Sequence, residues 1–554
     1  MRSKVLSDHV SPLSTTRILG VYDMFTSAED AASFGHNVPP FDVIVVGGGP
    51  VGAATALLIA RHGWTVAVIE KFAQPYALPR AVHFDDETAR ILQACRLGDV
   101  LGQISEPGDV YEWQNGTGDT LLRFGTEGRG PSGWPYANMF HQPDLEEHLN
   151  QLVIDHPIIS LVRGAEVIEI EQDDDGVDVT ITRSGETGSA PFTTTLSAQY
   201  VVGCDGANST VRDLMDIEMD DHGYFFDWLV VDVEMTSRRR FQPTNLQVCD
   251  PRRPTTVVSG GPGRRRWEFM CLPGETLEAL DDDHAAWELL RAWDVTPANA
   301  RLVRHAGYRF QARWATTWRK GRVFLAGDAA HQTPPFAGQG LCAGLHDAAN
   351  LAWKLDQVFT HGENSELLDT YQQERLPHVA TVIGLAMELG KIICVLDADE
   401  AAARDASLVP LAADGALTPP PAPLGLEAGL LETSSPGAGE LFVQGTITLG
   451  MESGLFDNVL SVGWRLINID DTPVSLPKDL DDWFISIGSG IVEMGPGGDV
   501  RDDDGVYHYW MQEHGVRVVL QRPDWYVFGT RTSSADAVSL VSELQRQLGA
   551  ASDD

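Results

Sequence analysis

Residues 42–70, DVIVVGGGPVGAATALLIARHGWTVAVIE, decide the fold class of this chain. The run 43–46 is continuous, apolar and β-branched, which is typical of a strand buried on both faces in a parallel sheet. A helix of small residues over 53–61 and a second apolar strand over 66–70 follow the glycines. Strand, glycine turn, helix and strand within about 30 residues form a βαβ unit, so we predict an α/β protein.

The glycine spacing predicts a dinucleotide site in this unit. Gly47, Gly49 and Gly52 fit the pattern G-x-G-x-x-G. The first glycine allows a tight turn, the second lets the backbone approach a pyrophosphate, and the third lets the helix pack closely on the strand. Glu70 ends the next strand, where a carboxylate can accept hydrogen bonds from both ribose hydroxyls of an adenosine. The alternative is a purely structural turn, and the motif alone does not choose between NAD and FAD.

Two later segments favour FAD over NAD as the bound dinucleotide. Residues 203–212 read GCDGANSTVR and residues 321–331 read GRVFLAGDAAH, and each places an acidic turn after a strand. In this order and spacing, the three segments resemble the single-component (class A) FAD-dependent aromatic hydroxylases of the para-hydroxybenzoate hydroxylase type. The resemblance implies FAD as cofactor, NADPH or NADH as transient reductant, and O2 and a small aromatic molecule as substrates. It gives Asp205-Gly206 a role toward FAD and NAD(P)H, and gives Asp328 the flavin ribityl chain; the alternative for Asp328 is a helix or turn cap.

The loop 334–341, PPFAGQGL, suits the edge of a flat ring. Its prolines stiffen the backbone, its glycines permit close approach, and it opens a helix whose N-terminal dipole would stabilise negative charge on reduced flavin. The resemblance further puts Arg80 at the pyrophosphate, Gln142 at the flavin and Val167 at the adenine, although Arg80 could instead form a surface salt bridge. The expected cofactor-binding residues are Gly47, Gly49, Pro50, Val51, Gly52, Glu70, Lys71, Arg80, Ala81, Gln142, Val167, Asp205, Gly206, Gly327, Asp328, Pro335, Gly338, Gln339, Gly340 and Leu341.

Within the family, the segments 327–342 and 347–355 most resemble the 3-(3-hydroxyphenyl)propionate hydroxylases, as do 250–256 and 265–269. The resemblance covers about residues 40 to 400. It implies that NAD(P)H reduces FAD, that reduced flavin reacts with O2, and that a flavin C4a-hydroperoxide hydroxylates a phenol. A phenol becomes more nucleophilic as its proton is drawn away, so a base or hydrogen-bond acceptor should lie nearby, and the sequence does not identify it.

Candidate residues for substrate binding come from the predicted substrate sheet, and the catalytic candidates come from the segments around Arg80 and Pro335. The substrate candidates are Tyr224, Asp227, Trp228, Gln247 and Arg266, and the catalytic candidates are Arg80, His83 and Pro335. Each has an alternative role in packing or in supporting the fold.

The resemblance implies a Rossmann-like FAD-binding domain, an inserted β-sheet substrate domain and a C-terminal thioredoxin-like domain, whose end the segment 520–528 resembles. The expected bounds are an N-terminal arm over 1–40, the FAD-binding domain over 41–220 and 311–403, the substrate domain over 221–310, a proline-rich linker over 404–437 and the last domain over 438–554. The last domain lacks CxxC and has no cysteine, since the final one is Cys394, so an interaction or homodimer-supporting role fits it better than thiol redox chemistry.

Composition excludes several classes of partner. The chain has 554 residues, with 40 Lys+Arg against 79 Asp+Glu and a formal net charge of −39, so its field repels nucleic acid and anionic membranes. The six cysteines are far apart in sequence and form no Cys/His cluster, which indicates a cytoplasmic protein without a metal site. The start of the chain has no continuous apolar core of the kind found in a secretory signal.

Two alternative functions remain open at this point. One is a tailoring oxygenase that hydroxylates a larger polycyclic or polyketide substrate or inserts oxygen in a Baeyer–Villiger reaction. The other is a flavin-bound redox or interaction protein without turnover.

Overall fold

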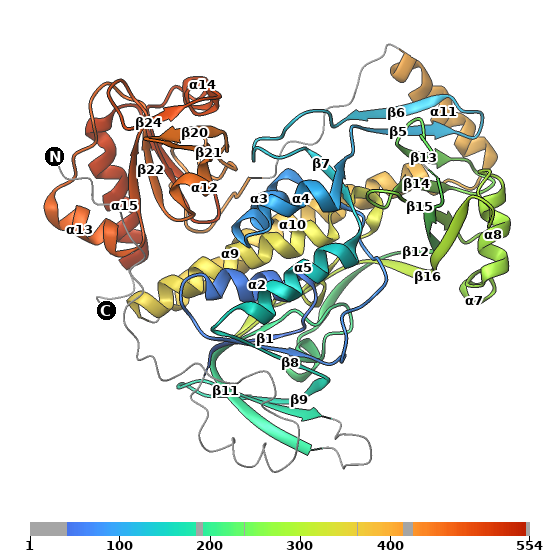
Figure 1. Ribbon diagram of the computed structural model, residues 1–554, viewed down its shortest axis with the longest axis horizontal. Coiled ribbons are helices and arrows are strands. Elements are labelled where there is room, and N and C mark those ends of the chain that lie inside the picture. Colours follow the sequence, from blue (N-terminus) through green and yellow to red (C-terminus); the bar gives the residue numbers. More distant parts are fainter. Residues whose placement is uncertain (1–40, 184–191, 238, 363, 414–424, 550–554) are drawn as a thin grey trace.

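The βαβ unit forms where the sequence predicts it (Figure 1). Strand β1 (Phe41–Val46) runs parallel to β2 (Val66–Glu70), and helix α2 (Pro50–Ala60) connects them. Helix α2 is buried along almost its whole length, which its small and apolar side chains allow. This computed structural model describes residues 41–183, 192–237, 239–362, 364–413 and 425–549.

A first sheet grows outward from this unit. Its central strands run in the order β18-β11-β1-β2-β8 and are all parallel, which confirms the predicted α/β class. The bounds are β8 (Ile159–Arg163), β11 (Phe192–Gly203), β17 (Arg319–Lys320) and β18 (Val323–Leu325), with β9 (Ala165–Gln172) and β10 (Val177–Arg183) as an antiparallel extension. Helices α5 (Gln142–Asp155) and α9 (Gly340–His361) pack on α2 above the sheet, as Figure 1 shows.

A second, largely antiparallel sheet lies beside the first. Its order is β19-β16-β12-β15-β14-β13-β5-β6. The bounds are β5 (Val110–Asn115), β6 (Thr120–Gly125), β12 (Met219–Met235), β13 (Asn245–Cys249), β14 (Thr255–Ser259), β15 (Arg264–Met270), β16 (Ala300–Ala315) and β19 (His331–Gln332). One face packs on α7 (Leu277–Leu280) and α8 (Asp283–Arg291) through an apolar core that contains Trp267 and Phe269. The opposite face is therefore free to form a site.

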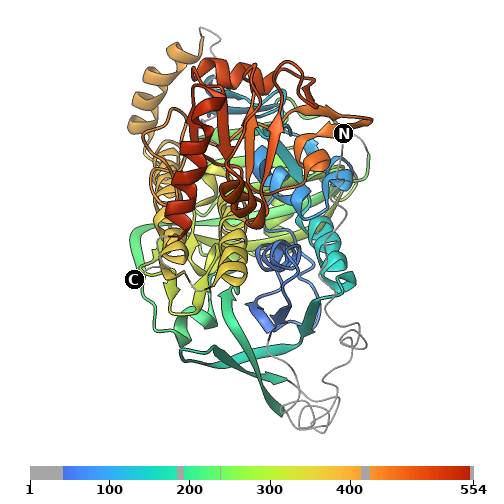
Figure 2. The same cartoon turned by 90° about the vertical axis from the view of Figure 1, so that its left-hand side faces the viewer.

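The C-terminal unit has the thioredoxin-like strand order. Strands β23 (Gly490–Glu493), β22 (Arg465–Asn468), β25 (Val518–Gln521) and β26 (Val527–Arg531) form a mixed sheet in that order. Its other elements are β20 (Thr446–Leu449), β21 (Glu452–Leu455), β24 (Val500–Asp502), α12 (Phe456–Leu460), α13 (Lys478–Ser486), α14 (Val506–Glu513) and α15 (Ala537–Gly549). Figure 2 shows this unit in front of the long helices of the middle layer.

Further elements connect the sheets in the described chain. They are β3 (His83–Asp85), α3 (Asp86–Ala94), α4 (Gly98–Ile104), β4 (Ser105–Pro107), β7 (Ala137–Phe140), α6 (Thr210–Leu214), α10 (Ser365–Ile393) and α11 (Ala398–Ala413). Helix α10 is long and apolar enough to cross a membrane by length and composition alone. It packs on α9 and buries the charged side chains of Glu374 and Arg375, which suits a core helix.

The structure departs from the expected domain bounds in three places. Strands β5 and β6 lie within 41–220 but pair into the second sheet, where β5 runs parallel to β13. Strand β16 continues unbroken across the expected boundary at 310/311. The expected linker begins inside α11, and its end is packed, because Leu426, Leu430 and Leu431 are buried. Residues 1–40 and 414–424 lie outside the described residues.

Candidate functional site

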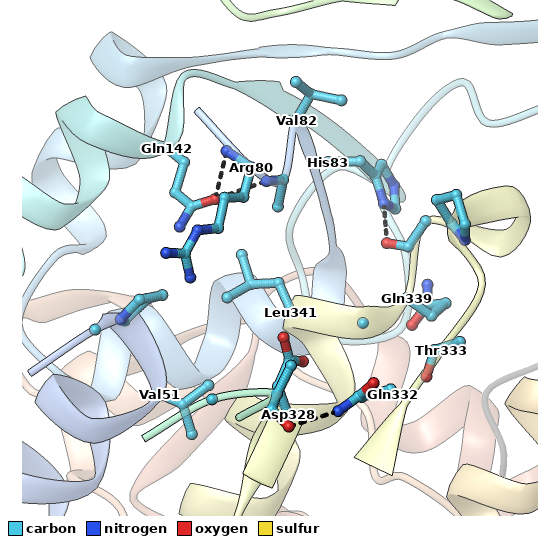
Figure 3. Close-up of a pocket in the computed structure, with 18 of the residues that line it drawn as sticks. Val51, Arg80, Val82, His83, Gln142, Asp328, Gln332, Thr333, Gln339 and Leu341 are labelled. Atoms are coloured by element: carbon cyan, nitrogen blue, oxygen red, sulfur yellow. Dashed lines mark hydrogen bonds between the residues drawn. The ribbon is translucent and has the colours of Figure 1, made fainter. Parts of the chain in front are cut away.

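A cavity of 1220 Å³ lies between the first sheet and the free face of the second. All of the expected cofactor-binding residues except Gly52 and Gly327 line it. His83, a catalytic candidate, also lines it, and so does one of the substrate candidates, Arg266. Segments distant in sequence therefore meet around a single space (Figure 3).

The three motif glycines have different surroundings. Gly47 has φ +106°, and a Cβ there would lie 2.4 Å from the Cys204 carbonyl oxygen. A Cβ on Gly52 would lie 1.9 Å from the Gly47 oxygen, so both glycines are required by the protein's own backbone. Gly49 differs, because no atom of the described residues lies within 4 Å of a Cβ built on it. Gly49 is the N-cap of α2 without a side-chain cap, so a helix N-terminus opens onto the cavity beside an empty space, as a pyrophosphate requires.

Glu70 holds the glycine turn from the end of β2. One carboxylate oxygen accepts a hydrogen bond from Gly48 N at 2.7 Å, and the other accepts one from Phe72 N at 2.8 Å. Each carboxylate oxygen has two lone pairs, so Glu70 can still accept from a ligand hydroxyl in the cavity that it lines.

Gln142 positions the segment that carries Arg80. Its Oε1 accepts from Arg80 N at 3.1 Å and from Ala81 N at 2.6 Å, as Figure 3 shows, and its Nε2 donates to Glu146 at 2.5 Å. The Arg80 guanidinium is exposed and lies over the Tyr76 ring at 4.4 Å. The resemblance predicted that Gln142 contacts the flavin. Its side-chain amide bonds to neighbouring protein groups and it also lines the cavity, so the flavin contact stays a prediction.

Arg266 and Arg304 support the same segment from the second sheet. Arg266 donates to the carbonyls of Pro79 and Arg80, and Arg304 also donates to Pro79 O. Arg266 forms a buried two-point ion pair with Asp232, at 2.7 and 3.0 Å. Sequence reasoning did not single out Asp232 or Arg304, because only the pairing of β12 with β15 and β16 brings them to Arg266.

Asp347 of α9 stabilises the Gly327-Asp328 turn. One Asp347 oxygen accepts from Gly327 N at 3.0 Å and lies 2.7 Å from His331 Nε2, while the other accepts from Arg375 Nε at 2.9 Å. Burial opposes the charge of this carboxylate, but His331 and Arg375 hold its pKa below the ordinary value. Asp328 is left exposed to the cavity at the end of β18 (Figure 3).

The Asp205-Gly206 turn is built mainly by its own contacts. The Asp205 carboxylate accepts from Ser209 Oγ at 2.5 Å and from Val211 N at 3.1 Å, and so supports the start of α6. Arg212 donates to Ala207 O at 3.1 Å and to Ala329 O at 3.2 Å, which joins this turn to the Gly327-Asp328 turn. Next to it, burial raises the pKa of the Cys204 thiol to about 12.

The loop before α9 presents a helix N-terminus to the cavity. Gly338 adopts φ +65°, and Gln339 is the N-cap of α9 without a side-chain cap. His83 Nδ1 lies 3.3 Å from Gly338 O, which fixes the loop against β3 (Figure 3). Burial lowers the pKa of His83. The free N–H groups of α9, together with the space at Gly49, fit the FAD that the resemblance implies.

Four of the five substrate candidates lie away from the cavity wall. Tyr224 packs on α10 at Gly390, Trp228 is buried with its ring 5.8 Å from that of Phe336, and Asp227 forms an exposed ion pair with Arg309. Gln247 is buried and accepts from the hydroxyls of Thr256, at 2.6 Å, and Tyr111, at 3.3 Å.

Other residues of the second sheet form the wall instead. The aromatic residues on the wall include Tyr111, Trp113, Phe124, Tyr308, Phe310 and Phe336. Val230, Thr256 and Glu268 form a cross-strand row beside them and also line the cavity. The charged residues Arg264, Arg266 and Glu268 alternate along 264–270, which indicates a polar face of this strand. The alternation does not tell which face borders the cavity.

Comparisons with known proteins cover nearly the whole chain. The family described as FAD binding domain matches residues 40–386, and the HcaD C-terminal domain matches residues 439–547. A probable NADH-specific resorcinol 4-hydroxylase of Rhodococcus jostii (strain RHA1) is 38% identical over 91% of this chain and 94% of its own length. A 3-(3-hydroxy-phenyl)propionate/3-hydroxycinnamic acid hydroxylase of Mycobacterium sp. (strain KMS) is 32% identical over 88% of each chain.

A solved structure has the same fold. The flavin-dependent monooxygenase PieE, in complex with FAD and substrate, superposes with a TM-score of 0.76 at 22% identity, over 92% of this chain and 99% of that one.

Proposed function

The chain belongs to the family of FAD-dependent aromatic hydroxylases that share the FAD binding domain, and from this premise we propose that it hydroxylates a monocyclic phenol with a meta substituent, using NADH and O2. One observation carries the proposal. The wall formed by Gly49, Glu70 and Asp328 is continuous with an aromatic-lined face of the second sheet. A dinucleotide and a small flat ring can therefore occupy one cavity together.

The cofactor roles follow from the groups that the chain presents to the cavity. With FAD bound, the N-terminus of α2 and Arg80 would hold the pyrophosphate, Glu70 would accept from the adenosine ribose, and Asp328 would accept from the ribityl chain. The N-terminus of α9 would stabilise negative charge on the edge of the flavin ring. FAD, when bound, supplies the redox chemistry that transfers electrons from NADH to O2.

The protein itself orients the phenol and excludes water. Phe310 and Phe336 lie with ring centroids 6.1 Å apart, and Trp228 packs behind Phe336, so this end of the cavity is apolar. Apolar walls keep water from competing with the substrate for the reactive oxygen. A polar contact to the phenol hydroxyl is then needed to fix which ring carbon is presented.

The substrate class rests on two relatives and on the aromatic lining. The names of those relatives give resorcinol and 3-(3-hydroxyphenyl)propionate, each a phenol with a substituent meta to the hydroxyl. The polycyclic alternative has weaker support, because the likeness to PieE is at 22% identity and concerns the fold. NADH is preferred to NADPH because the Rhodococcus relative is described as NADH-specific. A supply of NADH makes the cytoplasm the proposed compartment, and a homodimer through the C-terminal unit is the proposed assembly.

The test is product analysis on the purified FAD-loaded protein. Resorcinol, 3-(3-hydroxyphenyl)propionate, phenol and a polycyclic phenol are each supplied with NADH or NADPH, and coenzyme oxidation, O2 uptake and hydroxylated product are measured. We expect resorcinol or the propionate to stimulate NADH oxidation with about one product formed for each NADH consumed. Stimulation by the polycyclic phenol alone, or by none of the four, would contradict the proposal.

A further inference from the structure

One carboxylate on the second sheet faces the cavity and accepts no hydrogen bond from the residues that the structure describes. Glu268 lies in the middle of β15, between Val230 of β12 and Thr256 of β14. Its neighbours on the other face of β15, Trp267 and Phe269, belong to the core beneath α8. Strand alternation therefore turns Glu268 toward the cavity, where it lines the wall.

The cationic groups around Glu268 donate their hydrogen bonds to other residues. Arg266 is the nearest, with Nη1 at 3.7 Å from Glu268 Oε1, but it makes its two-point pair with Asp232 and donates to the carbonyls of Pro79 and Arg80. Arg304 donates to Pro79 O and to the Tyr308 hydroxyl at 2.5 Å, while its Nε has no hydrogen-bond partner among the described residues. In the described part of the chain, no group donates a hydrogen bond to the Glu268 carboxylate.

Two hydroxyl groups on the same wall donate to another residue. Thr256 and Tyr111 both donate to Gln247 Oε1. The Glu268 side chain is 13% exposed, and a carboxylate that has lost most of its water without gaining a donor is costly. Burial raises the pKa of Glu268, and the charge of Arg266 opposes this shift. The protein thus holds a strong acceptor in a largely apolar cavity and leaves the donor to be supplied by something else.

We propose that Glu268 is a substrate-binding residue whose carboxylate accepts a hydrogen bond from a hydroxyl group on the aromatic ring. This role rests on the proposed function. A ring hydroxyl can donate to Glu268, whereas a substrate carboxylate or ether oxygen cannot, so these groups are disfavoured at this position. The hydrogen bond fixes the ring in its plane against the aromatic wall. It also draws electron density toward the ring, which favours attack by an electrophilic oxygen.

The test compares two ligands in two proteins, and it measures binding without turnover. Resorcinol and 1,3-difluorobenzene have similar shapes, but only resorcinol can donate. Each is titrated into the FAD-loaded protein in the absence of NADH, and the change in flavin absorbance gives the dissociation constant. For Glu268→Leu we expect resorcinol to bind about 10- to 100-fold more weakly and the difluoro ligand to change less than about threefold. For Glu268→Gln, which keeps one acceptor oxygen, we expect an intermediate loss.

The control is Glu234→Leu, because Glu234 lies on the same sheet but forms an exposed pair with Arg301. It should leave both dissociation constants unchanged. FAD content is measured for every variant, and Glu268→Gln carries the test if the leucine variant fails to retain FAD. An unchanged ratio of the two dissociation constants in the Glu268 variants, with wild-type protein that still hydroxylates resorcinol, would overturn the role of Glu268 and leave the proposed function standing. Wild-type protein that neither binds nor hydroxylates any phenol would overturn both.

Discussion

Gly49 and Gly52 of the G-x-G-x-x-G motif contribute differently to folding and to FAD binding. Substitution of each by alanine, which adds one methyl group, separates the two contributions. We expect Gly49→Ala to fold with stability within about 1 kcal/mol of wild type, because its φ of −74° suits alanine and nothing lies near the added Cβ. The methyl group should instead enter the space that a pyrophosphate needs and weaken FAD binding about 10- to 100-fold. Thermal unfolding of the FAD-free protein and titration with FAD measure the two effects.

Gly52→Ala is the matched comparison in the same turn. Its Cβ would clash with the Gly47 oxygen, so we expect a loss of about 3 kcal/mol in unfolding free energy before any cofactor is added. If both variants lost stability equally and bound FAD normally, Gly49 would be a structural glycine like its neighbour.

A buried acid near the cavity makes stability depend on pH. Burial, followed by the charge of Asp85, raises the pKa of Asp86 to about 7. A carboxyl group with a native pKa above its unfolded value costs stability as pH rises between those two values, and the cost persists above the higher one. We therefore expect Asp86→Asn to be more stable than wild type, with the gain growing by about 2–3 kcal/mol from pH 5 to pH 8.

Urea unfolding of both proteins at the two pH values measures this gain. Asn can still accept from Ser132 N, which Asp86 holds at 2.9 Å, so the substitution removes the charge and keeps the contact. A gain that is equal at the two pH values would mean that Asp86 does not titrate in this range.

At the scale of single elements, helix α9 acts as the support of the cofactor turn. Asp347→Asn should leave Arg375 buried without its counter-charge and loosen Gly327-Asp328, so we expect a loss of about 3–5 kcal/mol in stability. FAD affinity should fall at least tenfold, although Asp347 itself does not line the cavity. Equilibrium dialysis with FAD measures the affinity.

Asp356→Asn provides the control on the same helix. Asp356 accepts from Trp64 Nε1 at 2.9 Å and pairs with His62, away from the cavity. This variant should lose about 1–2 kcal/mol and bind FAD normally. Loss of FAD from both variants in proportion to their stability would indicate a general effect of unfolding.

Local patterns predicted some elements and missed the partners of others. The β1–α2–β2 unit was predictable because strand, turn and helix carry their own signals within residues 42–70. Strand β5 was not assigned to the second sheet, because its pairing with β13 joins residues more than 100 apart in the chain. Proline-rich composition predicted a linker over 404–437, but packing of α11 on β6 makes its first part helical. The hydrogen bonds of Gln142 and Gln247 to neighbouring residues were not predictable for the same reason, since side-chain hydrogen bonds depend on tertiary placement.

At the scale of the whole molecule, a buried charge cluster joins the C-terminal unit to the middle layer. Glu374 lies 2.7 Å from both Lys354 Nζ and Arg522 Nη2, and Arg522 also pairs with Asp524 at 2.7 Å. The four side chains are almost completely buried. Two positive and two negative charges cancel, so losing one charge is costlier than losing an opposite pair.

We expect Glu374→Gln and Arg522→Met each to lower the unfolding free energy by about 3–5 kcal/mol, because each leaves a net charge buried. The double variant restores neutrality and should be more stable than the sum of the single effects by about 2–3 kcal/mol. Denaturant unfolding of the four proteins gives this coupling energy. Strict additivity would mean that the cluster does not act as a unit.

The cluster also adjoins the cofactor support. Arg375, which holds Asp347, is the residue after Glu374 on α10. The cysteine-free C-terminal unit therefore contacts, through one helix, the residues that hold the Gly327-Asp328 turn. The family resemblance implied the thioredoxin-like fold of this unit, but not this contact, because Arg522 meets Glu374 from about 150 residues away.

The protonation state of the Cys204 thiol determines how readily this residue is oxidised during the reaction. It lies beside the Gly47 turn, 3.9 Å from Thr55 Oγ1, and its pKa of about 12 keeps it almost entirely protonated at neutral pH. Oxidants attack the thiolate, so a protonated thiol reacts slowly even where reduced oxygen species escape from the cofactor. Cys204 should therefore stay unoxidised during turnover, and storage without a reducing agent should not inactivate the enzyme through this residue.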